Sequence, residues 1–218
     1  RRQRQMCIRD SNNLYRAFVY AVSEGAWGVQ LVFDNKVILG TRARKTRTRS
    51  FDAFSSIDYP ETAVFRDTRL IPFLRRPADL PPVQFYEQLD PAVFVLRLVP
   101  GMRADIIPLL EGRYRALVLE SFGVGGLPGG DDGAMFAAVR DWCGAGHLAV
   151  FTTQVPHEGS DLAVYEVGRA AKALPGVLEA HDMTPEATAV KLMWVLGQTT
   201  DRAEAEKLFL TPVQWDIL

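Results

Sequence analysis

The chain has 218 residues, of which 48% are hydrophobic and 23% are charged, and its formal net charge at pH 7 is -1. This length allows one large α/β domain or two small ones, and the near-neutral charge gives no bulk attraction to nucleic acid or to an anionic membrane. Only two cysteines occur, Cys7 and Cys143, without a C-x-x-C pair. This cysteine usage favours a reducing compartment, the cytoplasm, over a disulfide framework.

The chain opens with a segment, residues 1–10, that lacks apolar periodicity and any apolar core of a signal peptide. The run QMCIRDS is similar to translated adapter sequence, so we expect residues 1–10 to be non-native. From Asn12 to Val22 the apolar residues recur at helical spacing, which predicts a helix. The run Val29–Phe33 predicts a buried strand, and a turn at Asp34 leads to a second strand over Lys36–Leu39.

A basic run follows over residues 41–50 (TRARKTRTRS). It carries the five positive charges of Arg42, Arg44, Lys45, Arg47 and Arg49. One hypothesis is a phosphate-binding strip. We favour a solvated extended segment with alternating exposed charges, or salt bridges to a neighbouring subunit, because no aromatic stacking platform accompanies the charges.

Five prolines between Pro72 and Pro91 disfavour regular helix and indicate a linker over residues 72–91. Beyond it, the sequence predicts a strand at Val93–Leu98, a short helix at Asp105–Leu110 and a buried strand at Ala116–Leu119. A helix over Asp132–Trp142 and a strand over Leu148–Thr152 come next. This alternation predicts a parallel sheet with right-handed crossovers. Thr184-Pro185-Glu186 has the signature of a helix start.

The glycine-rich stretch GVGGLPGG, from Gly123 to Gly130, lies between a strand and a helix, where an α/β sheet places ligands. It is not a dinucleotide fingerprint, since Pro128 replaces the third glycine, and no Gly-Lys-Ser/Thr follows. The glycines alone are also explained by a tight turn.

A second candidate is the acidic stretch HEGSDLAVYEVG, which holds Glu158, Asp161 and Tyr165. At a spacing of four, Asp161 and Tyr165 would share a helix face. Paired carboxylates suit acid–base chemistry, but we favour helix capping by Ser160 or Asp161, with Tyr165 packed at an interface.

The remaining reactive side chains favour structural roles. Thr152 and Thr153 stand at a strand end without an adjacent base, where threonine satisfies backbone groups. We expect Cys143 to pack in the core as a small apolar residue rather than to act as a catalytic thiol. The three histidines, His147, His157 and His181, have no ligand spacing, so we expect no metal.

In order and spacing these motifs resemble bacterial type I, cytoplasmic L-asparaginases. The most specific matches are SFGVGGLP and DMT-x-E-A-x-x-x-K-L, the latter at Asp182–Leu192. The resemblance implies an α/β fold: the end of an N-terminal α/β domain (residues 11–71), the linker (72–91), and a smaller C-terminal α/β domain with a parallel sheet (92–218). It implies hydrolysis of L-asparagine to aspartate and ammonia in a homodimer or homotetramer, without a cofactor, nucleic acid or membrane.

The family's glycine loop reaches a neighbouring subunit's active site, and this chain has Gly126 where many members have Asn. Gly126, Glu158 and Asp161 are therefore the expected substrate-binding residues across a subunit interface. The chain has no T-G-G-T-I and no T-D-T-M block, so the family's nucleophilic Thr and its Thr–Asp–Lys group have no matching positions. We expect a fragment that is inactive alone, with no catalytic residue of its own.

Positions that bind a regulatory asparagine in some relatives correspond here to Glu120 and Val155, so that regulation is not expected. Two alternatives stay open. One is the asparaginase-like subunit of a tRNA-dependent amidotransferase, and the other is a non-catalytic α/β module that binds a small molecule.

Overall fold

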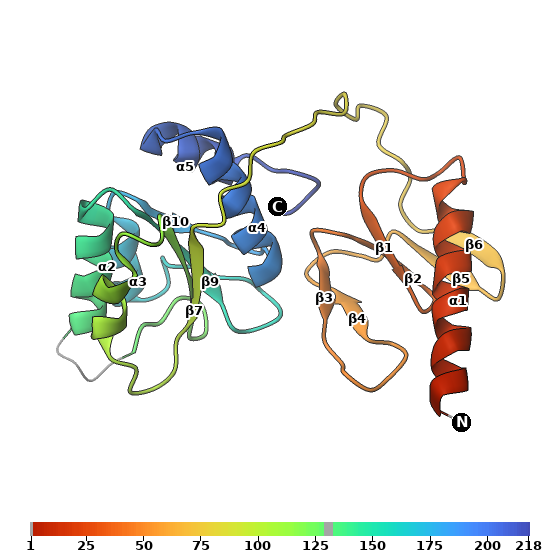
Figure 1. Ribbon diagram of the computed structural model, residues 1–218, viewed down its shortest axis with the longest axis horizontal. Coiled ribbons are helices and arrows are strands. Elements are labelled where there is room, and N and C mark those ends of the chain that lie inside the picture. Colours follow the sequence, from red (N-terminus) through yellow and green to blue (C-terminus); the bar gives the residue numbers. More distant parts are fainter. Residues whose placement is uncertain (1, 129–132) are drawn as a thin grey trace. The chain divides into compact units, whose positions relative to one another are not determined.

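The computed structural model describes residues 2–128 and 133–218, which form two compact units, Arg1–Gln84 and Phe85–Leu218 (Figure 1). Each unit has its own sheet and its own hydrophobic core. No helix within the described part of the chain is both long and apolar enough to cross a membrane.

The first unit combines one long helix, α1 (Arg2–Ala21), with short antiparallel strands. Its main sheet has the order β1-β2-β5-β6, and a separate hairpin pairs β3 with β4. The strands are β1 (Gln30–Phe33), β2 (Lys36–Leu39), β3 (Ala43–Lys45), β4 (Phe54–Ser56), β5 (Ala63–Arg66) and β6 (Arg69–Pro72).

The predicted order of helix, strand, turn and strand is confirmed, with two corrections. The helix begins at Arg2, well before Asn12. The first strand, β1, is only half-buried, because it is an edge strand with one neighbour, while the inner strand β2 carries the fully buried residues Val37 and Ile38. The non-native origin of residues 1–10 stays a prediction.

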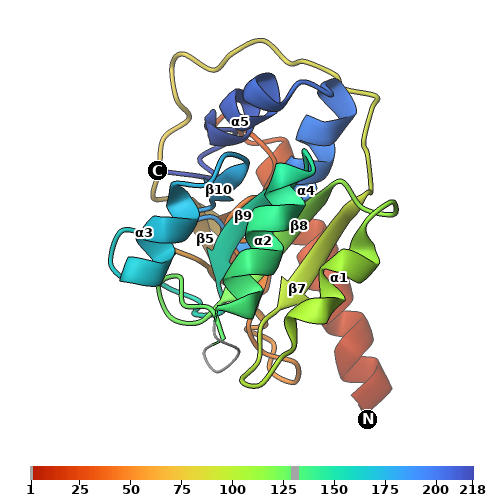
Figure 2. The same ribbon diagram turned by 90° about the vertical axis from the view of Figure 1, so that its left-hand side faces the viewer.

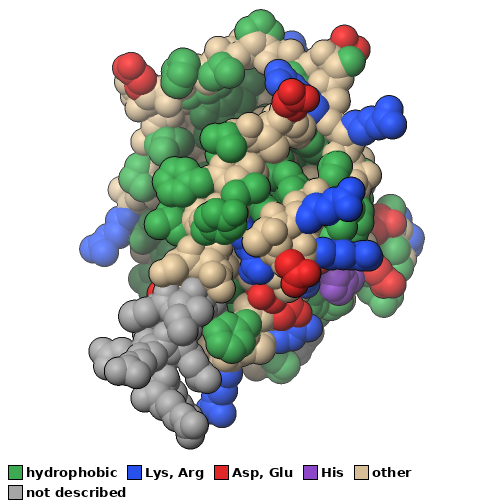
Figure 3. Space-filling model, turned by 90° about the vertical axis from the view of Figure 1, so that its right-hand side faces the viewer, with side chains coloured by type: hydrophobic (Ala, Val, Ile, Leu, Met, Phe, Trp, Pro, Cys, Tyr) green, Lys and Arg blue, Asp and Glu red, His purple; other side chains and the backbone are tan. Residues whose placement is uncertain are grey.

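A stripe of apolar side chains lies exposed on α1 and at Val22, the residue that follows it. Leu14, Tyr15, Phe18 and Val22 are 60%, 53%, 64% and 82% exposed. Figure 3 shows hydrophobic side chains gathered on this side of the first unit. Contiguous exposed apolar surface of this kind is typical of a face that other protein covers.

The basic run does not form a uniform strip. Arg42 is fully buried, with its guanidinium 5.7 Å from the centre of the Tyr59 ring, so it is not one of the exposed charges. Arg47 pairs with Asp52 at 2.9 Å, and Lys36 pairs with the same carboxylate at 2.8 Å. The run thus lies on the β3–β4 hairpin and its loop, where Arg47 makes its ion pair within the chain; salt bridges to a neighbouring subunit stay a prediction.

The second unit is built on a parallel sheet with the order β10-β9-β8-β7. Its strands are β7 (Val93–Arg97), β8 (Ala116–Ser121), β9 (Leu148–Thr153) and β10 (Val177–Glu179). Its α-helices are α2 (Ala134–Gly144), α3 (Glu166–Lys172), α4 (Pro185–Gln198) and α5 (Arg202–Leu210). Two 3₁₀ turns, Ala104–Ile106 and Pro108–Leu110, replace the short helix expected at Asp105–Leu110.

Because the strands are added in one direction through right-handed crossovers, every crossover lies on the same face of the sheet. Figures 1 and 2 show α2 and α3 on that face, and α4 and α5 on the other. Side chains alternate accordingly: Leu117 and Phe151 enter the core under α2, while Val118 and Val150 enter the core under α4. The predicted parallel sheet is confirmed.

The helix start predicted at Thr184 is also confirmed. The Thr184 hydroxyl accepts the Ala187 N–H at 3.1 Å, and Pro185 occupies the first helical position. Helix α2 begins at Ala134 rather than Asp132, and Asp131 and Asp132, the acidic residues expected at its start, lie outside the described residues.

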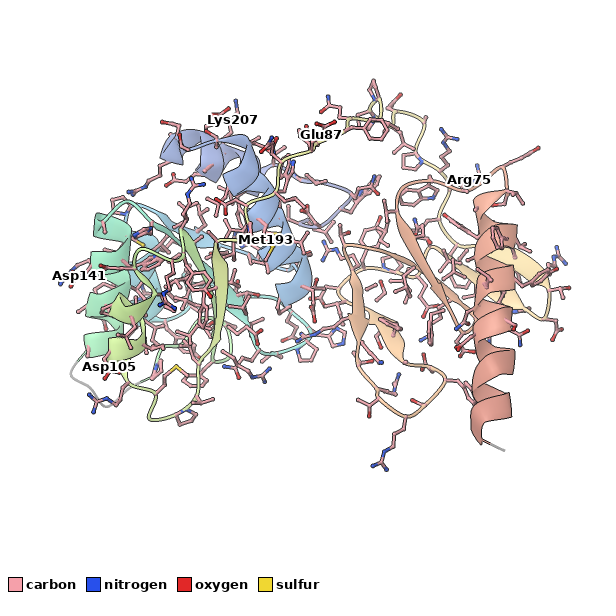
Figure 4. All side chains as sticks on the ribbon, in the orientation of Figure 1. Arg75, Glu87, Asp105, Asp141, Met193 and Lys207 are labelled. Atoms are coloured by element: carbon pink, nitrogen blue, oxygen red, sulfur yellow. The ribbon has the colours of Figure 1, made fainter. Side chains whose placement is uncertain are left out.

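The last residues before β7 are fixed to the second unit. The Asp90 N–H donates to the Met193 carbonyl at 3.0 Å, and the Asp90 carboxylate pairs with Arg115 at 2.7 Å. Figure 4 labels Met193 on α4 and Glu87 on the segment that crosses it. A Cβ on Gly197 would lie 2.5 Å from the Gln88 carbonyl, so α4 needs a glycine where this segment passes. The domain limits 11–71, 72–91 and 92–218 remain predictions.

Candidate active site

The predicted site residues lie on two loops at the carboxyl edge of the parallel sheet. Strands β8 and β9 end in register, with Ser121 opposite Thr153. The loop after β8 carries Gly126, and the loop after β9 carries Glu158 and Asp161. The Asp161 N–H donates to the Val124 carbonyl at 2.8 Å, so the backbone itself joins the two loops. This edge is where an α/β sheet binds ligands.

The glycine loop is a tight turn closed on itself. Phe122 and Gly126 exchange backbone hydrogen bonds of 3.0 and 2.7 Å. At Gly125, φ is +148°, and a Cβ would lie 2.6 Å from Leu162 Cδ2. The tight-turn interpretation therefore holds for residues 122–126, while Gly129 and Gly130 lie outside the described residues. The Gly126 N–H is already used inside the turn, so Gly126 shapes the loop.

The loop after β9 is pressed against the turn after β10. The Ser160 N–H donates to the His181 carbonyl at 2.8 Å. Gly159 has φ +67°, and a Cβ there would lie only 2.5 Å from that same carbonyl oxygen. Glu158 has φ +77°, a left-handed conformation that costs a non-glycine residue about 1–3 kcal/mol. Such strain is found where the surrounding structure fixes a functional loop.

Asp161 holds a turn rather than a helix. Its Oδ1 accepts the Ala163 N–H at 2.9 Å, and α3 begins only at Glu166. The prediction that Asp161 and Tyr165 share a helix face is therefore wrong, because this local side-chain bond competes with helix formation. Both side chains remain exposed at the rim of the site.

Glu179, which the sequence did not single out, anchors this loop from below. Its side chain is only 3% exposed, and its carboxylate accepts the Leu162 N–H at 2.7 Å and the Lys172 ammonium at 2.9 Å. The bond to Glu179 raises the pKa of Lys172. In the sequence, Glu179 is the single acidic residue in the otherwise apolar run VLEA, and this pattern could have indicated a buried carboxylate. Buried carboxylates of this kind need partners.

Of the two threonines at the end of β9, Thr153 satisfies backbone groups as expected, whereas the Thr152 hydroxyl has no hydrogen-bond partner among the described residues. The Thr153 hydroxyl donates to the Gly123 carbonyl and accepts the Val155 N–H at 3.0 Å, which ties the β8 and β9 loops together. Thr152 is fully buried. Neither hydroxyl is placed to attack a substrate.

Gln154 joins three strand ends at the same edge. Its Nε2 donates to the carbonyls of Leu98 at 2.6 Å and of Glu120 at 2.8 Å. The Glu120 carboxylate pairs with Arg97 at 3.3 Å. Val155 is 45% exposed.

His147 and Cys143 lie outside this arrangement, whereas His157 lies on the loop after β9, directly before Glu158. His147 stacks on Trp142 with ring centres 4.2 Å apart, and His181 Nδ1 lies 3.9 Å from Glu179. Cys143 is buried, and burial raises the pKa of its thiol to about 11, so the expected packing role fits. Within residues 2–128 and 133–218, no three metal-binding side chains cluster.

A wider hollow of about 600 Å³ lies at the opposite edge of the sheet, between the end of α3 and the start of α5. Its lining includes Lys172, which is held by Glu179, and Arg202, which is held by Glu206 at 3.2 Å. Its cations are thus already paired, so we place the candidate site at the carboxyl edge.

A family model described as "Glutaminase/Asparaginase C-terminal domain" matches residues 92–209, more than half of the chain, and one described as "Asparaginase, N-terminal" matches residues 6–77. The chain belongs to the glutaminase/asparaginase family. The resemblance of the motifs is therefore confirmed at the level of the family.

Individual relatives agree. The L-asparaginase of Thermococcus kodakarensis is 38% identical over 197 residues, covering 90% of this chain and 58% of that protein. A glutamyl-tRNA(Gln) amidotransferase subunit of Metallosphaera sedula is 35% identical over 178 residues, covering 79% of this chain and 39% of that protein. The solved structure of the thermostable L-asparaginase from T. kodakarensis has a TM-score of 0.87 at 34% identity, covering 94% of this chain and 62% of that chain.

The chain thus spans 58% of the length of this asparaginase and 39% of the length of the M. sedula protein.

Proposed function

We propose that this chain supplies the substrate-facing half of an L-asparaginase. Such an enzyme hydrolyses the side-chain amide of L-asparagine, which gives L-aspartate and ammonia. In this reaction a threonine hydroxyl attacks the side-chain amide carbon, ammonia leaves, and water then hydrolyses the acyl-enzyme ester. Amides are poor electrophiles, so a nucleophile, a base and oxyanion donors must converge on one carbon.

The observation that carries the proposal is the junction between the two loops. Through Asp161 N–H and Val124 O, the loop with Gly126 and the loop with Glu158 form one surface. Glu158 and Asp161 are both exposed there. We assign their carboxylates to the α-ammonium group of asparagine, because a carboxylate accepts strong charge-assisted hydrogen bonds from ammonium.

The nucleophile is assigned to no residue of this chain. The T-G-G-T-I and T-D-T-M blocks are not in the sequence, the Thr153 hydroxyl is bonded to backbone groups, and the Thr152 hydroxyl is fully buried. We therefore propose that residues 1–218 alone release no ammonia from asparagine.

A chimera tests this division of labour. The part of T. kodakarensis L-asparaginase that this chain does not cover would be joined to this chain, with the aligned residues of that enzyme replaced. Ammonia release from L-asparagine by the chimera, and none by residues 1–218, supports the proposal. A soluble, folded chimera without activity would contradict it.

The substrate residues are proposed to act across a subunit interface in a homodimer or homotetramer. The support is the exposed apolar surface beside the loops, where Val155, Val164 and Tyr165 are 45%, 51% and 57% exposed. Sedimentation of the chimera at several concentrations measures the assembly. A cytoplasmic location, and the lack of a cofactor or metal, remain predictions from the sequence.

A second candidate is the asparaginase-like subunit of a tRNA-dependent amidotransferase. The similarity to the glutamyl-tRNA(Gln) amidotransferase protein of M. sedula favours it. Rates of ammonia release from asparagine and glutamine separate the two: a strong preference for glutamine would favour the amidotransferase.

A further inference from the structure

The last residues of the chain, 211–218, form a hook after α5. The Val213 N–H donates to Asp216 Oδ1 at 2.7 Å, and the Asp216 N–H returns a bond to the Val213 carbonyl at 3.0 Å. Between them, Gln214 and Trp215 have φ values of +52° and +55°. Two consecutive left-handed non-glycine residues persist only where the surroundings determine them.

What holds the hook is a buried ion pair with α4. Lys191 Nζ lies 2.8 Å from Asp216 Oδ2, and both side chains are almost fully buried, at 4% and 3% exposure. The same ammonium donates to the Thr211 carbonyl at 2.8 Å, so it contacts the hook at two points. A buried pair is weak evidence for stability, because apolar residues of similar volume often do as well. Its best-attested use is to fix one arrangement of the chain.

The hook is connected to the candidate site through one hydrogen bond to a side chain and further bonds between backbone groups. The Leu218 N–H donates to Asp182 Oδ1 at 3.1 Å. Asp182 follows His181, whose carbonyl accepts the Ser160 N–H and lies against Gly159. One step further, the Asp161 N–H reaches Val124 in the glycine loop. The hook, the turn after β10 and both loops of the site therefore form one connected chain of contacts.

We propose that Lys191 and Asp216 are positioning residues: their ion pair clamps the hook, and the hook holds the turn at His181–Asp182 under the loop that carries Glu158 and Asp161. The importance of this loop for substrate rests on the proposed function. Whether the Lys191–Asp216 pair holds the loop in place is a structural question, and it can be tested without substrate.

Amide hydrogen exchange on residues 1–218 measures the clamp. The informative amides are those of Ser160 and Asp161, with the α2 amide of Val139 as an internal reference in the same sample. Asp216→Asn leaves the Lys191 charge buried without its counter-ion. The double variant Lys191→Met/Asp216→Leu removes both charges and keeps the site apolar, which separates positioning from a charge left unpaired.

In both variants we expect exchange at Ser160 and Asp161 to become about tenfold faster relative to Val139, because a local opening exposes these amides before global unfolding. Asp216→Glu, which keeps the charge, should restore most of the protection. The matched control is Arg140→Gln/Asp141→Asn, which removes an exposed pair of 2.9 Å on α2 (Asp141 is labelled in Figure 4). It should change nothing at Ser160.

Unchanged protection of Ser160 and Asp161 in the double variant would overturn the inference, even if the hook itself exchanged faster. A uniform acceleration that includes Val139 would also overturn it, since the pair would then serve stability alone. Neither result depends on asparagine hydrolysis, so failure of the clamp and failure of the proposed function are distinguishable.

Discussion

The backbone N–H of Asp161 donates a 2.8 Å hydrogen bond to the carbonyl of Val124, thirty-seven positions earlier in the numbering. Together with the bond from the Thr153 hydroxyl to the Gly123 carbonyl, it joins two loops that follow different strands into a single surface at the carboxyl edge of the sheet. Backbone groups form the bond between Asp161 and Val124, so side chains such as Glu158 and that of Asp161 itself stay exposed above it.

Because Gly159 lies close to the His181 carbonyl, we predict that alanine destabilises the second unit more at position 159 than at position 126. Gly159→Ala should lower the free energy of unfolding of the second unit by about 2–3 kcal/mol, because φ is +67° and the new Cβ would lie 2.5 Å from a backbone oxygen. Gly126→Ala is the matched control: its nearest contact is 3.3 Å and it is not left-handed, so we expect less than about 1 kcal/mol. Urea unfolding followed by tryptophan fluorescence measures both, and equal effects would contradict the geometry.

Glu179 should hold the loop after β9 in its folded position through its bond to the Leu162 N–H. Glu179→Ala removes the acceptor of both the Leu162 N–H and the Lys172 ammonium. We expect a loss of about 1–3 kcal/mol, because a buried N–H is left unsatisfied, and faster proteolysis between residues 154 and 165. Lys172→Met should lower the free energy of unfolding by less, because the Lys172 side chain is half-exposed. A proteolysis rate in Glu179→Ala equal to that of the unmodified chain would rule out this anchoring role.

The acid stability of the second unit should depend on Asp90. A hydrogen bond from the Ala92 N–H, aided by Arg115, holds the pKa of Asp90 below its ordinary value of 3.8. The folded state therefore binds fewer protons than the unfolded state. The resulting stabilisation is present above pH 3.8 and is lost as pH falls through the lower folded pKa.

Asp90→Asn should accordingly flatten the fall in unfolding free energy below about pH 4, while it lowers stability near neutral pH. Chemical unfolding from about pH 2 to 7 gives this profile, with Asp141→Asn, on an exposed carboxylate, as the control. A variant whose acid profile keeps the slope of the unmodified chain would show that another group carries the effect.

The sequence predicts local features of this fold well. The α4 start at Thr184 was recoverable because its cap and its proline are adjacent in sequence. The parallel sheet was recoverable because strands buried on both faces have continuous apolar runs. Gly126, Glu158 and Asp161 lie on the loops after β8 and β9, at the carboxyl edge of the sheet, and their role in binding substrate stays a prediction.

Features set by tertiary contacts were not recoverable. Glu179 acquires its role from Leu162, seventeen residues away, and from Lys172 on α3. The half-burial of β1 depends on its place at the sheet edge, and the fully buried Arg42 depends on packing with Tyr59. At Asp161 a helical spacing was present, but the side-chain bond to Ala163 formed a turn instead.

The central claim is that this chain carries the asparagine-facing loops and not the nucleophile. Ammonia release from L-asparagine tests it most directly, in three samples: residues 1–218, the chimera with the uncovered part of the T. kodakarensis enzyme, and that chimera with Asp161→Ala. We predict no release from the first and turnover from the second. In the third, kcat/KM should fall by roughly 10- to 100-fold, the effect of losing a charge-assisted hydrogen bond worth about 1.5–3 kcal/mol. Turnover by residues 1–218 alone, or an Asp161→Ala chimera as active as its parent, would contradict the claim.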